Sequence, residues 1–135
     1  MRVVLDTNVV ASALFFGGRP AEVLSMAADG RIQAVANAPI VEEYQETFDA
    51  LLERYHGRGR GLTLAPVLSL LELVPVQAQV SVCRDPDDDK FIGCAMDGRC
   101  LYVVSGDKDL LTVGRHQGVR IVTVAEFLEI CAARS

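Results

Sequence analysis

The sequence predicts an α/β fold in which helices cover both faces of a central parallel sheet. Short β-branched runs alternate with helical patterns along the whole chain, and this order is typical of parallel sheets. Half of the 135 residues are hydrophobic, which suffices for a core, and the length suits a single domain over residues 1–135. No apolar run reaches the roughly 20 residues that span a bilayer, and no signal-peptide pattern opens the chain. We therefore expect a cytoplasmic protein without a membrane partner.

The first half of the chain is predicted to form two strands, over 2–5 and 32–36, and four helices, over 9–16, 20–29, 37–55 and 64–73. The run RVVL ends at Asp6, which predicts a buried strand leading into a turn. Pro20 suits the first turn of the second helix and Gly30 suits its end. The apolar residues of the long helix form one stripe at helical spacing, and Pro75 breaks the helix after it.

The second half is predicted to contain a poor strand or extended connection, a helix, two strands and a C-terminal helix, over 76–82, 85–98, 101–104, 119–122 and 123–133. Asp85 is a good N-cap because a proline follows it in the first helical position. Asp87 and Asp88 in the first turn suit the positive end of the helix dipole. Thr123 and Glu126 have the spacing of a capping box.

The aspartates are concentrated in one segment of the chain. The net charge is −5 at neutral pH, and residues 85–109 alone contain seven aspartates against three basic residues. By charge alone, such a chain is a poor electrostatic binder of nucleic acid. An acidic cluster is solvated, used in helix capping or neutralised by a cation. Asp85 and Asp87 suit capping of the helix, and Asp109 suits capping of a short turn at 110–111.

The four cysteines carry no metal-binding or disulfide pattern. They form no CxxC pair, and neither histidine has the spacing of a zinc ligand. Because no secretory signal precedes them, free buried or half-buried thiols are predicted for all four.

Four carboxylates from distant parts of the chain are expected at one edge of the sheet. Ligands of open α/β sheets collect beyond the C-terminal ends of the strands, near the point where strand order reverses. Asp6 ends the first strand, and Asp107 follows the strand over 101–104. Asp89 lies in the first turn of a predicted helix and shares a face with Ile92 and Met96, which should turn it inward. Glu42 and Glu43 both lie off the apolar stripe of the long helix, so periodicity does not choose between them.

An edge with carboxylates and without histidine or thiolate predicts a hard divalent cation. Mg²⁺ prefers oxygen ligands and takes one or two carboxylates, waters and phosphate oxygens. Mg²⁺ or Mn²⁺ is therefore expected here and Zn²⁺ is not. Such a site activates water and neutralises the charge that develops in an in-line phosphoryl displacement.

Four segments, in their order and spacing, carry a resemblance to a known family: LDTNVVASA, PIVEEYQETF, DPDDDKFIGCAM and VVSGDKDLL. From Arg2 to about Phe127 the chain resembles PIN-domain proteins, and more narrowly the bacterial PIN-family toxins of toxin–antitoxin systems, which are related to the VapC ribonucleases. The resemblance implies a three-layer α/β/α fold and a metal-dependent endoribonuclease. It also implies an RNA substrate, a cognate antitoxin protein and a homodimer.

Carried over by position, the resemblance assigns the catalytic and metal-binding roles to Asp6, Glu43, Asp89 and Asp107. These acids would bind one or two Mg²⁺ or Mn²⁺ ions, which lower the pKa of the water that attacks the phosphodiester. Supporting hydrogen bonds to carboxylates or water are expected from Asn8, Ser12, Ser105 and Asp109. With metal bound, the acidic site would hold phosphate instead of repelling it.

Basic residues after the long helix are the best candidates for steering RNA phosphates, through Arg54, Arg58 and Arg60. Arg19 and Arg115 are candidates to join them. A solvated loop between helices is an equally good interpretation, since glycine-flanked arginines need no function to stay exposed. Two other functions stay open beside the ribonuclease toxin. One is a PIN-like module that binds RNA or protein without cutting, and the other is a housekeeping RNA-processing nuclease or another phosphoryl hydrolase.

Overall fold

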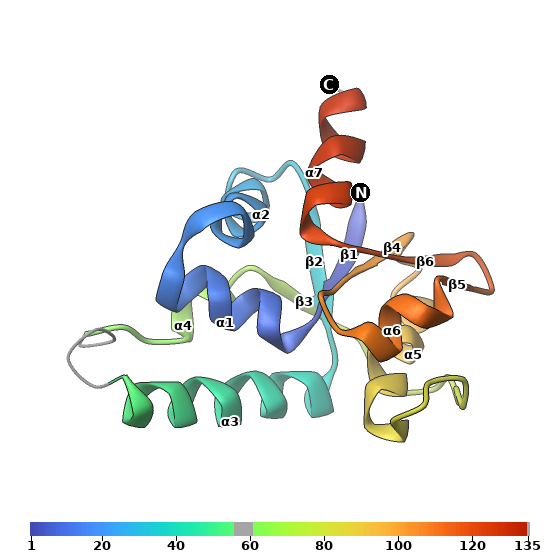
Figure 1. Ribbon diagram of the computed structural model, residues 1–135, viewed down its shortest axis with the longest axis horizontal. Helices are drawn as coiled ribbons and strands as arrows, with labels where there is room; N and C mark the ends of the chain where they lie inside the picture. Colours follow the sequence, from blue (N-terminus) through green and yellow to red (C-terminus); the bar gives the residue numbers. More distant parts are fainter. Residues whose placement is uncertain (56–60, 135) are drawn as a thin grey trace.

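A computed structural model describes residues 1–55 and 61–134, which fold around a six-stranded sheet with the strand order β3-β2-β1-β4-β6-β5 (Figure 1). The strands are β1 (Arg2–Leu5), β2 (Gln33–Ala36), β3 (Leu71–Leu73), β4 (Tyr102–Val104), β5 (Arg115–His116) and β6 (Val119–Val122). All neighbours pair in parallel except β5, which forms an antiparallel hairpin with β6. The predicted α/β fold with a mostly parallel central sheet is confirmed.

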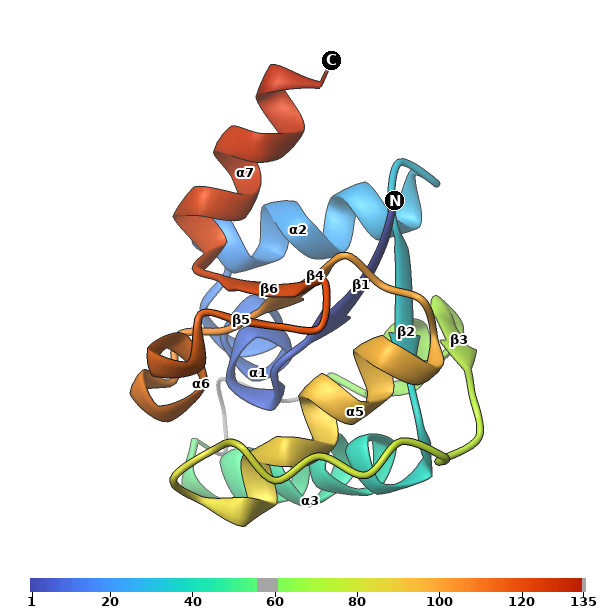
Figure 2. The ribbon, with the colours of Figure 1, turned by 90° about the vertical axis from the view of Figure 1, so that its right-hand side faces the viewer.

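Helices flank the sheet on both sides. They are α1 (Thr7–Phe16), α2 (Gly18–Ala28), α3 (Ala38–Arg54), α4 (Ala65–Leu68), α5 (Asp89–Asp97), α6 (Lys108–Val113) and α7 (Val124–Ala133). Helix α5 packs against β1, β2, β4 and β6, while α1 and α2 lie on the opposite side of the sheet and α7 packs against α2 (Figures 1 and 2). Helix α3 contacts both α1 and α5 and so lies across one end of the sheet.

The core follows from the β-branched strands and from one face of each helix. Val3 and Val4 of β1 are fully buried, as are Phe91 and Ile92 of α5. Burying side chains of this size contributes roughly 1.5–3 kcal/mol each to stability, so the contact between α5 and the sheet is a main source of stability. The carboxylates described below extend from the ends of these well-packed elements.

The prediction of a helix over 64–73 is wrong for most of its length. Only Ala65–Leu68 is helical, and Leu71–Leu73 forms β3, which pairs in parallel with Ala34–Ala36. Hydrogen bonding to the open edge of β2 therefore overrides the helical spacing of the apolar residues. The residues between β3 and the short 3-10 turn Pro86–Asp88 run as an extended connection, which agrees with one of the two predicted alternatives.

Two smaller elements differ from the prediction near the C-terminus. The short turn expected at 110–111 is a full helix, α6, and β5 was not predicted. The capping box of Thr123 and Glu126 is present at the start of α7, as predicted. Cys94, Cys100 and Cys131 are buried and Cys83 is half-buried, which agrees with the predicted burial of the thiols. None of the described helices combines the length and the apolar character that crossing a membrane requires.

Candidate metal centre

The register of the sheet places three polar residues side by side at its C-terminal edge. Leu5 pairs with Val104, and Val104 pairs with Val122, so the residues that follow them, Asp6, Ser105 and Thr123, begin at the same level. The chain runs outward from β1 to β2 and β3 and then returns to β4 on the other side of β1. Strand order thus reverses between β1 and β4, where open α/β sheets form their ligand sites.

Asp6 is held at this point by a buried serine. The Asp6 carboxylate is only 5% exposed, and its Oδ2 atom accepts a hydrogen bond from the Ser105 hydroxyl at 2.6 Å. Although Asp6 is the N-cap residue of α1, its side chain forms no capping bond to that helix. Burial raises the pKa of Asp6, and the hydrogen bond from Ser105 opposes the rise. The charges of Asp107 and Glu43 raise the pKa further, so three acids share one electrostatic environment.

Ser105 also positions Asp107. The Ser105 hydroxyl oxygen accepts a hydrogen bond from the backbone N–H of Asp107 at 2.9 Å. Asp107 is the N-cap of α6, where its Oδ1 atom accepts from the N–H groups of Asp109 and Leu110 at 2.7 and 3.2 Å. Asp107 therefore caps α6, and the interpretation of Asp109 as the cap is wrong. The prediction that Ser105 hydrogen-bonds the acids agrees with these contacts.

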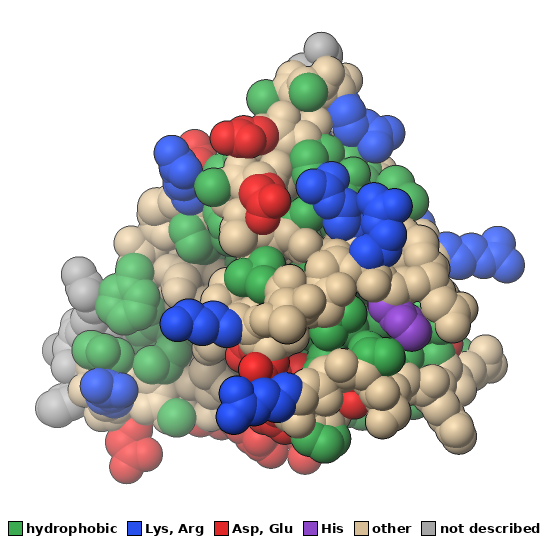
Figure 3. All heavy atoms as spheres, turned by 45° about the vertical axis from the view of Figure 1, so that its right-hand side comes forward, with side chains coloured by type: hydrophobic (Ala, Val, Ile, Leu, Met, Phe, Trp, Pro, Cys, Tyr) green, Lys and Arg blue, Asp and Glu red, His purple; other side chains and the backbone are tan. Residues whose placement is uncertain are grey.

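Three carboxylates meet beside Asp6. Oxygen atoms of Asp88, Asp107 and Asp109 lie within 4.8 Å of one another. Burial raises the pKa of Asp88 to about 6, and the negative charges around it, first Asp107, add to the rise. Within the part of the chain that the structure describes, none of the three forms an ion pair with a basic side chain. On this face, acidic side chains gather in a hollow with Lys and Arg side chains beside it (Figure 3).

The structure does not bring Asp89 into this cluster. Asp89 is 8% exposed, and its Oδ1 atom accepts hydrogen bonds from the backbone N–H groups of Val82 and Cys83 at 3.0 and 2.9 Å. Burial acts to raise the pKa of Asp89, but the hydrogen bonds from Cys83 and Val82 lower it below the ordinary value. Asp89 thus holds the extended connection against α5.

Asp97 also holds the extended connection against α5, at the other end of the helix. Its two carboxylate oxygens accept from the N–H groups of Gln77 and Ala78, both at 2.9 Å. The structure therefore divides the acids of this segment between two tasks, with Asp88 at the cluster and Asp89 on the backbone. The sequence pattern did not separate these tasks, because Asp88 and Asp89 are adjacent acids at the start of one predicted helix.

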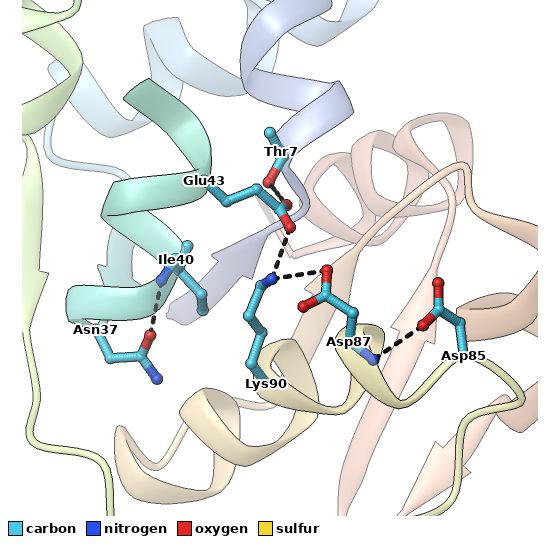
Figure 4. A network of polar contacts seen from close by, with 7 residues as sticks. All are labelled: Thr7, Asn37, Ile40, Glu43, Asp85, Asp87 and Lys90. Carbon is cyan, nitrogen blue, oxygen red and sulfur yellow. Dashed lines mark hydrogen bonds and ion pairs between the residues drawn. The ribbon is translucent and has the colours of Figure 1, made fainter. Parts of the chain in front are cut away.

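Glu43 is brought to the site by the start of α3. The Asn37 side chain caps this helix by accepting from the Ile40 N–H at 3.1 Å, as Figure 4 shows. The Tyr44 hydroxyl donates to the carbonyl oxygen of Leu5 and fixes α3 to the end of β1. This contact turns the neighbouring Glu43 inward and leaves Glu42 exposed. Helical periodicity leaves open which of Glu42 and Glu43 faces the sheet edge, and in the structure it is Glu43.

A lysine pairs with Glu43. The Glu43 carboxylate accepts hydrogen bonds from the Thr7 hydroxyl and from the Lys90 ammonium, the latter at 2.6 Å. Lys90 also donates to Asp87 at 3.0 Å and so lies between the two acids (Figure 4). Burial lowers the pKa of Lys90, but its two carboxylate partners outweigh burial and raise it above the ordinary value. The pair leaves Glu43 at the border of the site with its charge compensated.

The remaining predicted residues lie around the cluster or beyond it. Asn8 and Ser12 stand one turn apart on α1 and line a hollow together with Ser105. In the part of the chain that the structure describes, neither side chain forms a hydrogen bond to the acids. Arg54 is exposed at the end of α3, with its guanidinium 5.4 Å from the centre of the Tyr55 ring. The two further predicted RNA contacts, Arg58 and Arg60, lie outside the described residues.

The donor set of the cluster suits a hard divalent cation. It offers carboxylate oxygens only, which Mg²⁺ and Mn²⁺ prefer, and it lacks the imidazole and thiolate ligands that Zn²⁺ prefers. Three close carboxylates also repel one another, as the raised pKa of Asp88 indicates, and a bound cation would remove that repulsion. The residues present therefore fit a divalent metal site.

Comparisons with known proteins agree with this fold. A family model described as the PIN domain matches residues 2–109. The uncharacterized protein MJ1680 of Methanocaldococcus jannaschii is 30% identical over 117 residues, which cover 84% of this chain and 75% of that protein. A chain in the crystal structure of VapBC2 from Rickettsia felis, bound to a DNA fragment from their promoter, has a similar fold. Its TM-score is 0.59 and its identity 12%, over 91% of this chain and 98% of that one.

Proposed function

This chain belongs to the PIN-domain family, and we propose that it is a divalent-metal-dependent endoribonuclease that acts as the toxin of a toxin–antitoxin pair. The observation that carries the nuclease proposal is the cluster of Asp88, Asp107 and Asp109 beside Asp6, at the edge where strand order reverses. The four sequence segments that resemble PIN-family toxins, and the likeness of the fold to a chain of VapBC2, support the toxin role.

The cluster is the proposed site of Mg²⁺ or Mn²⁺. Asp88, Asp107 and Asp109 would hold the ion, and Asp88 takes the place that the sequence resemblance gave to Asp89. When bound, a divalent ion supplies charge neutralisation at the phosphate and activation of the attacking water. It would also reverse the sign of the local potential, which lets a negatively charged chain hold RNA.

The side chains around the cluster have distinct proposed roles. Ser105 fixes Oδ2 of Asp6, and the Asp6 carboxylate is the proposed acceptor of the proton from the attacking water. The raised pKa of Asp6 strengthens it as a base. Glu43 and Lys90 form the border of the site, where Glu43 adds negative potential and Lys90 limits it.

The basic residues of the sequence and the family resemblance suggest the proposed partners. RNA would approach over the exposed Arg54 and over Arg58 and Arg60, whose charges attract phosphates. An antitoxin protein would bind the chain in the cytoplasm and keep it inactive, and two copies of the chain would form a homodimer. These assignments rest on the family resemblance and on the fold.

Cleavage of labelled RNA in Mg²⁺ or Mn²⁺ tests the proposal, with DNA and nucleotides as alternative substrates. The wild-type chain is expected to cut RNA only when a divalent ion is present. Asp107→Asn is expected to keep the fold, because the amide oxygen still caps α6, and to lose activity by roughly a thousandfold. Cleavage that persists in a chelator, or in the Asp107→Asn variant, would contradict the proposal. RNA binding without cleavage would favour the non-catalytic module instead.

A further inference from the structure

A second hollow lies next to the acid cluster and contains no acid. It has a volume of about 390 Å³ and lies among α1, the start of α2, the link that follows β4, and the start of α7. Its lining includes Asn8, Ser12, Arg19, Pro20, Ser105 and Val124. Ser105 forms part of both sites, because its hydroxyl also holds the Asp6 carboxylate at 2.6 Å. The two hollows are therefore adjacent and share one buried side chain.

The chemistry of this hollow is opposite to that of the cluster. Arg19 supplies a cation, Asn8 and Ser12 supply neutral hydrogen-bonding groups, and the buried Val9 and Pro20 supply an apolar wall. Within residues 1–55 and 61–134 no carboxylate forms an ion pair with Arg19. Its charge is thus available to an anion from outside the chain.

The position of Arg19 is set by two glycines. Gly17 and Gly18 join α1 to α2 with φ angles of +69° and +67°, which side chains other than glycine rarely adopt. This turn places Arg19 in the first turn of α2, at the rim of the hollow. The uncapped N–H groups of that turn add partial positive charge on the same side.

We propose that this hollow binds the nucleotide next to the phosphodiester that the acid cluster cleaves. Arg19 would contact the phosphate of that nucleotide, the apolar wall would contact its base, and Asn8 and Ser12 would hydrogen-bond the base edge or the 2′-hydroxyl. The inference rests on the proposed function, and it deepens it by naming where the substrate is held. A volume of about 390 Å³ lies in the range of small-molecule sites.

A nucleotide fits the observations better than a segment of a partner protein. The hollow combines one unpaired guanidinium with hydroxyl and amide groups, which matches a phosphate attached to a polar ring. Because Ser105 links the hollow to Asp6, a strand with one phosphate at the cluster passes directly over the hollow.

Fluorescence anisotropy with a short fluorescein-labelled single-stranded RNA tests the inference. Binding is measured in Mg²⁺, with Asp6→Asn added to every chain so that no cleavage occurs while the acid cluster is kept, for the otherwise wild-type chain, Arg19→Ala, Ala125→Phe and Arg31→Ala. Arg19→Ala is expected to weaken binding about tenfold and to reduce the salt slope by about 0.7. Ala125→Phe fills the hollow and is expected to weaken binding as well. Arg31→Ala removes the same charge beyond the opposite end of α2 and is expected to bind as wild type.

Thermal unfolding midpoints equal to that of the wild type show that the variants are folded. If Ala125→Phe does not fold, the salt dependence of RNA binding by Arg19→Ala decides the result. Wild-type RNA affinity in both hollow variants, equal losses in Arg19→Ala and Arg31→Ala, or no binding by the wild type would overturn the inference. Metal-dependent cleavage is assayed in parallel on the wild type. If the wild type does not cleave RNA but Arg19→Ala still weakens RNA binding as expected, the proposed nuclease function is wrong. The hollow would then still be a nucleotide-binding site.

Discussion

Asp88 and Asp89 are neighbours in the sequence and do opposite things in the structure. Asp89 is satisfied by two backbone N–H groups, which lower its pKa, and it holds the extended connection in place. Asp88 faces other acids, and burial among these charges raises its pKa to about 6. The difference teaches that a carboxylate is a candidate metal ligand when its surroundings leave its charge uncompensated, whatever its place in a motif.

The same contrast separates two sides of α5 and of the turn that precedes it. On the connection side, Asp89 and Asp97 each accept hydrogen bonds from two backbone N–H groups of the connection between β3 and the 3-10 turn. On the cluster side, Asp88, which directly precedes α5, joins Asp107 and Asp109. Changes on the connection side should therefore alter stability, and changes on the cluster side should alter metal binding and catalysis.

The largest expected effect is the loss of activity in Asp88→Asn. Removing one carboxylate of the cluster should reduce RNA cleavage by roughly a thousandfold, since the ion loses a ligand. The thermal midpoint of the metal-free variant should equal or exceed that of the wild type, because the substitution removes repulsion among the acids. Single-turnover cleavage in Mn²⁺ and a thermal melt in a chelator measure both effects. The matched control, Asp89→Asn, should cleave at nearly the wild-type rate.

Stability should fall most when Asp89 is truncated. Asp89→Ala leaves the N–H groups of Val82 and Cys83 without their acceptor, which should lower the free energy of unfolding by about 2 kcal/mol. Asp89→Asn keeps an oxygen acceptor and should lose much less. Urea unfolding of both variants measures the difference. Equal stability in the alanine variant and the wild type would show that Asp89 does not hold the connection.

Asp97→Ala should have a similar but smaller effect at the other end of α5. Asp97 and its partner Gln77 are more exposed than Asp89, so water replaces part of the lost hydrogen bonding. The expected loss is about 1 kcal/mol in the free energy of unfolding, with Mn²⁺ affinity unchanged. Urea unfolding measures the loss of stability, and a Mn²⁺ titration of the same protein sample measures the metal affinity. Weakened Mn²⁺ binding would mean that the two sides of α5 are not separate.

A change of pH is expected to have a milder effect, on Mn²⁺ affinity and on the stability of the metal-free chain. Protons compete with the cation for Asp88, whose pKa is raised to about 6, so Mn²⁺ affinity should fall as the pH drops below 6. For the metal-free chain the sign is opposite: a raised folded-state pKa favours the fold at low pH, and that contribution is lost as the pH rises through about 6. Titrations of Mn²⁺ at pH values from about 1 unit below to about 2 units above the pKa of Asp88 measure the first effect. Asp88→Asn should remove the change near pH 6.

Much of the fold could be predicted from the sequence, because strong local patterns decide it. The β-branched runs gave β1, β4 and β6, and the apolar stripe with its Asn37 cap gave α3. The segment over 64–73 failed because pairing with β2, a contact distant in sequence, outweighs its helical spacing. Tertiary contacts of this kind leave no local signal.

Part of the candidate site could be predicted from the sequence. Asp6 and Asp107 follow directly from the ends of strands, where direction is fixed by the sheet. Asp88 and Asp89 differ because a 3-10 turn, and not an α-helical turn, follows the Asp85 cap, and this changes which side chain faces the edge. The compensation of Glu43 by Lys90 depends on contact between α3 and α5, which the sequence does not encode locally.

The most direct test of the central claim is a calorimetric titration of Mn²⁺ into the wild-type chain, Asp88→Asn and Asp89→Asn at neutral pH. If the cation is held by the cluster of Asp88, Asp107 and Asp109, Asp88→Asn should lose measurable binding and Asp89→Asn should bind as wild type. Loss of binding in Asp89→Asn together with wild-type affinity in Asp88→Asn would contradict the account and place the metal site at Asp89.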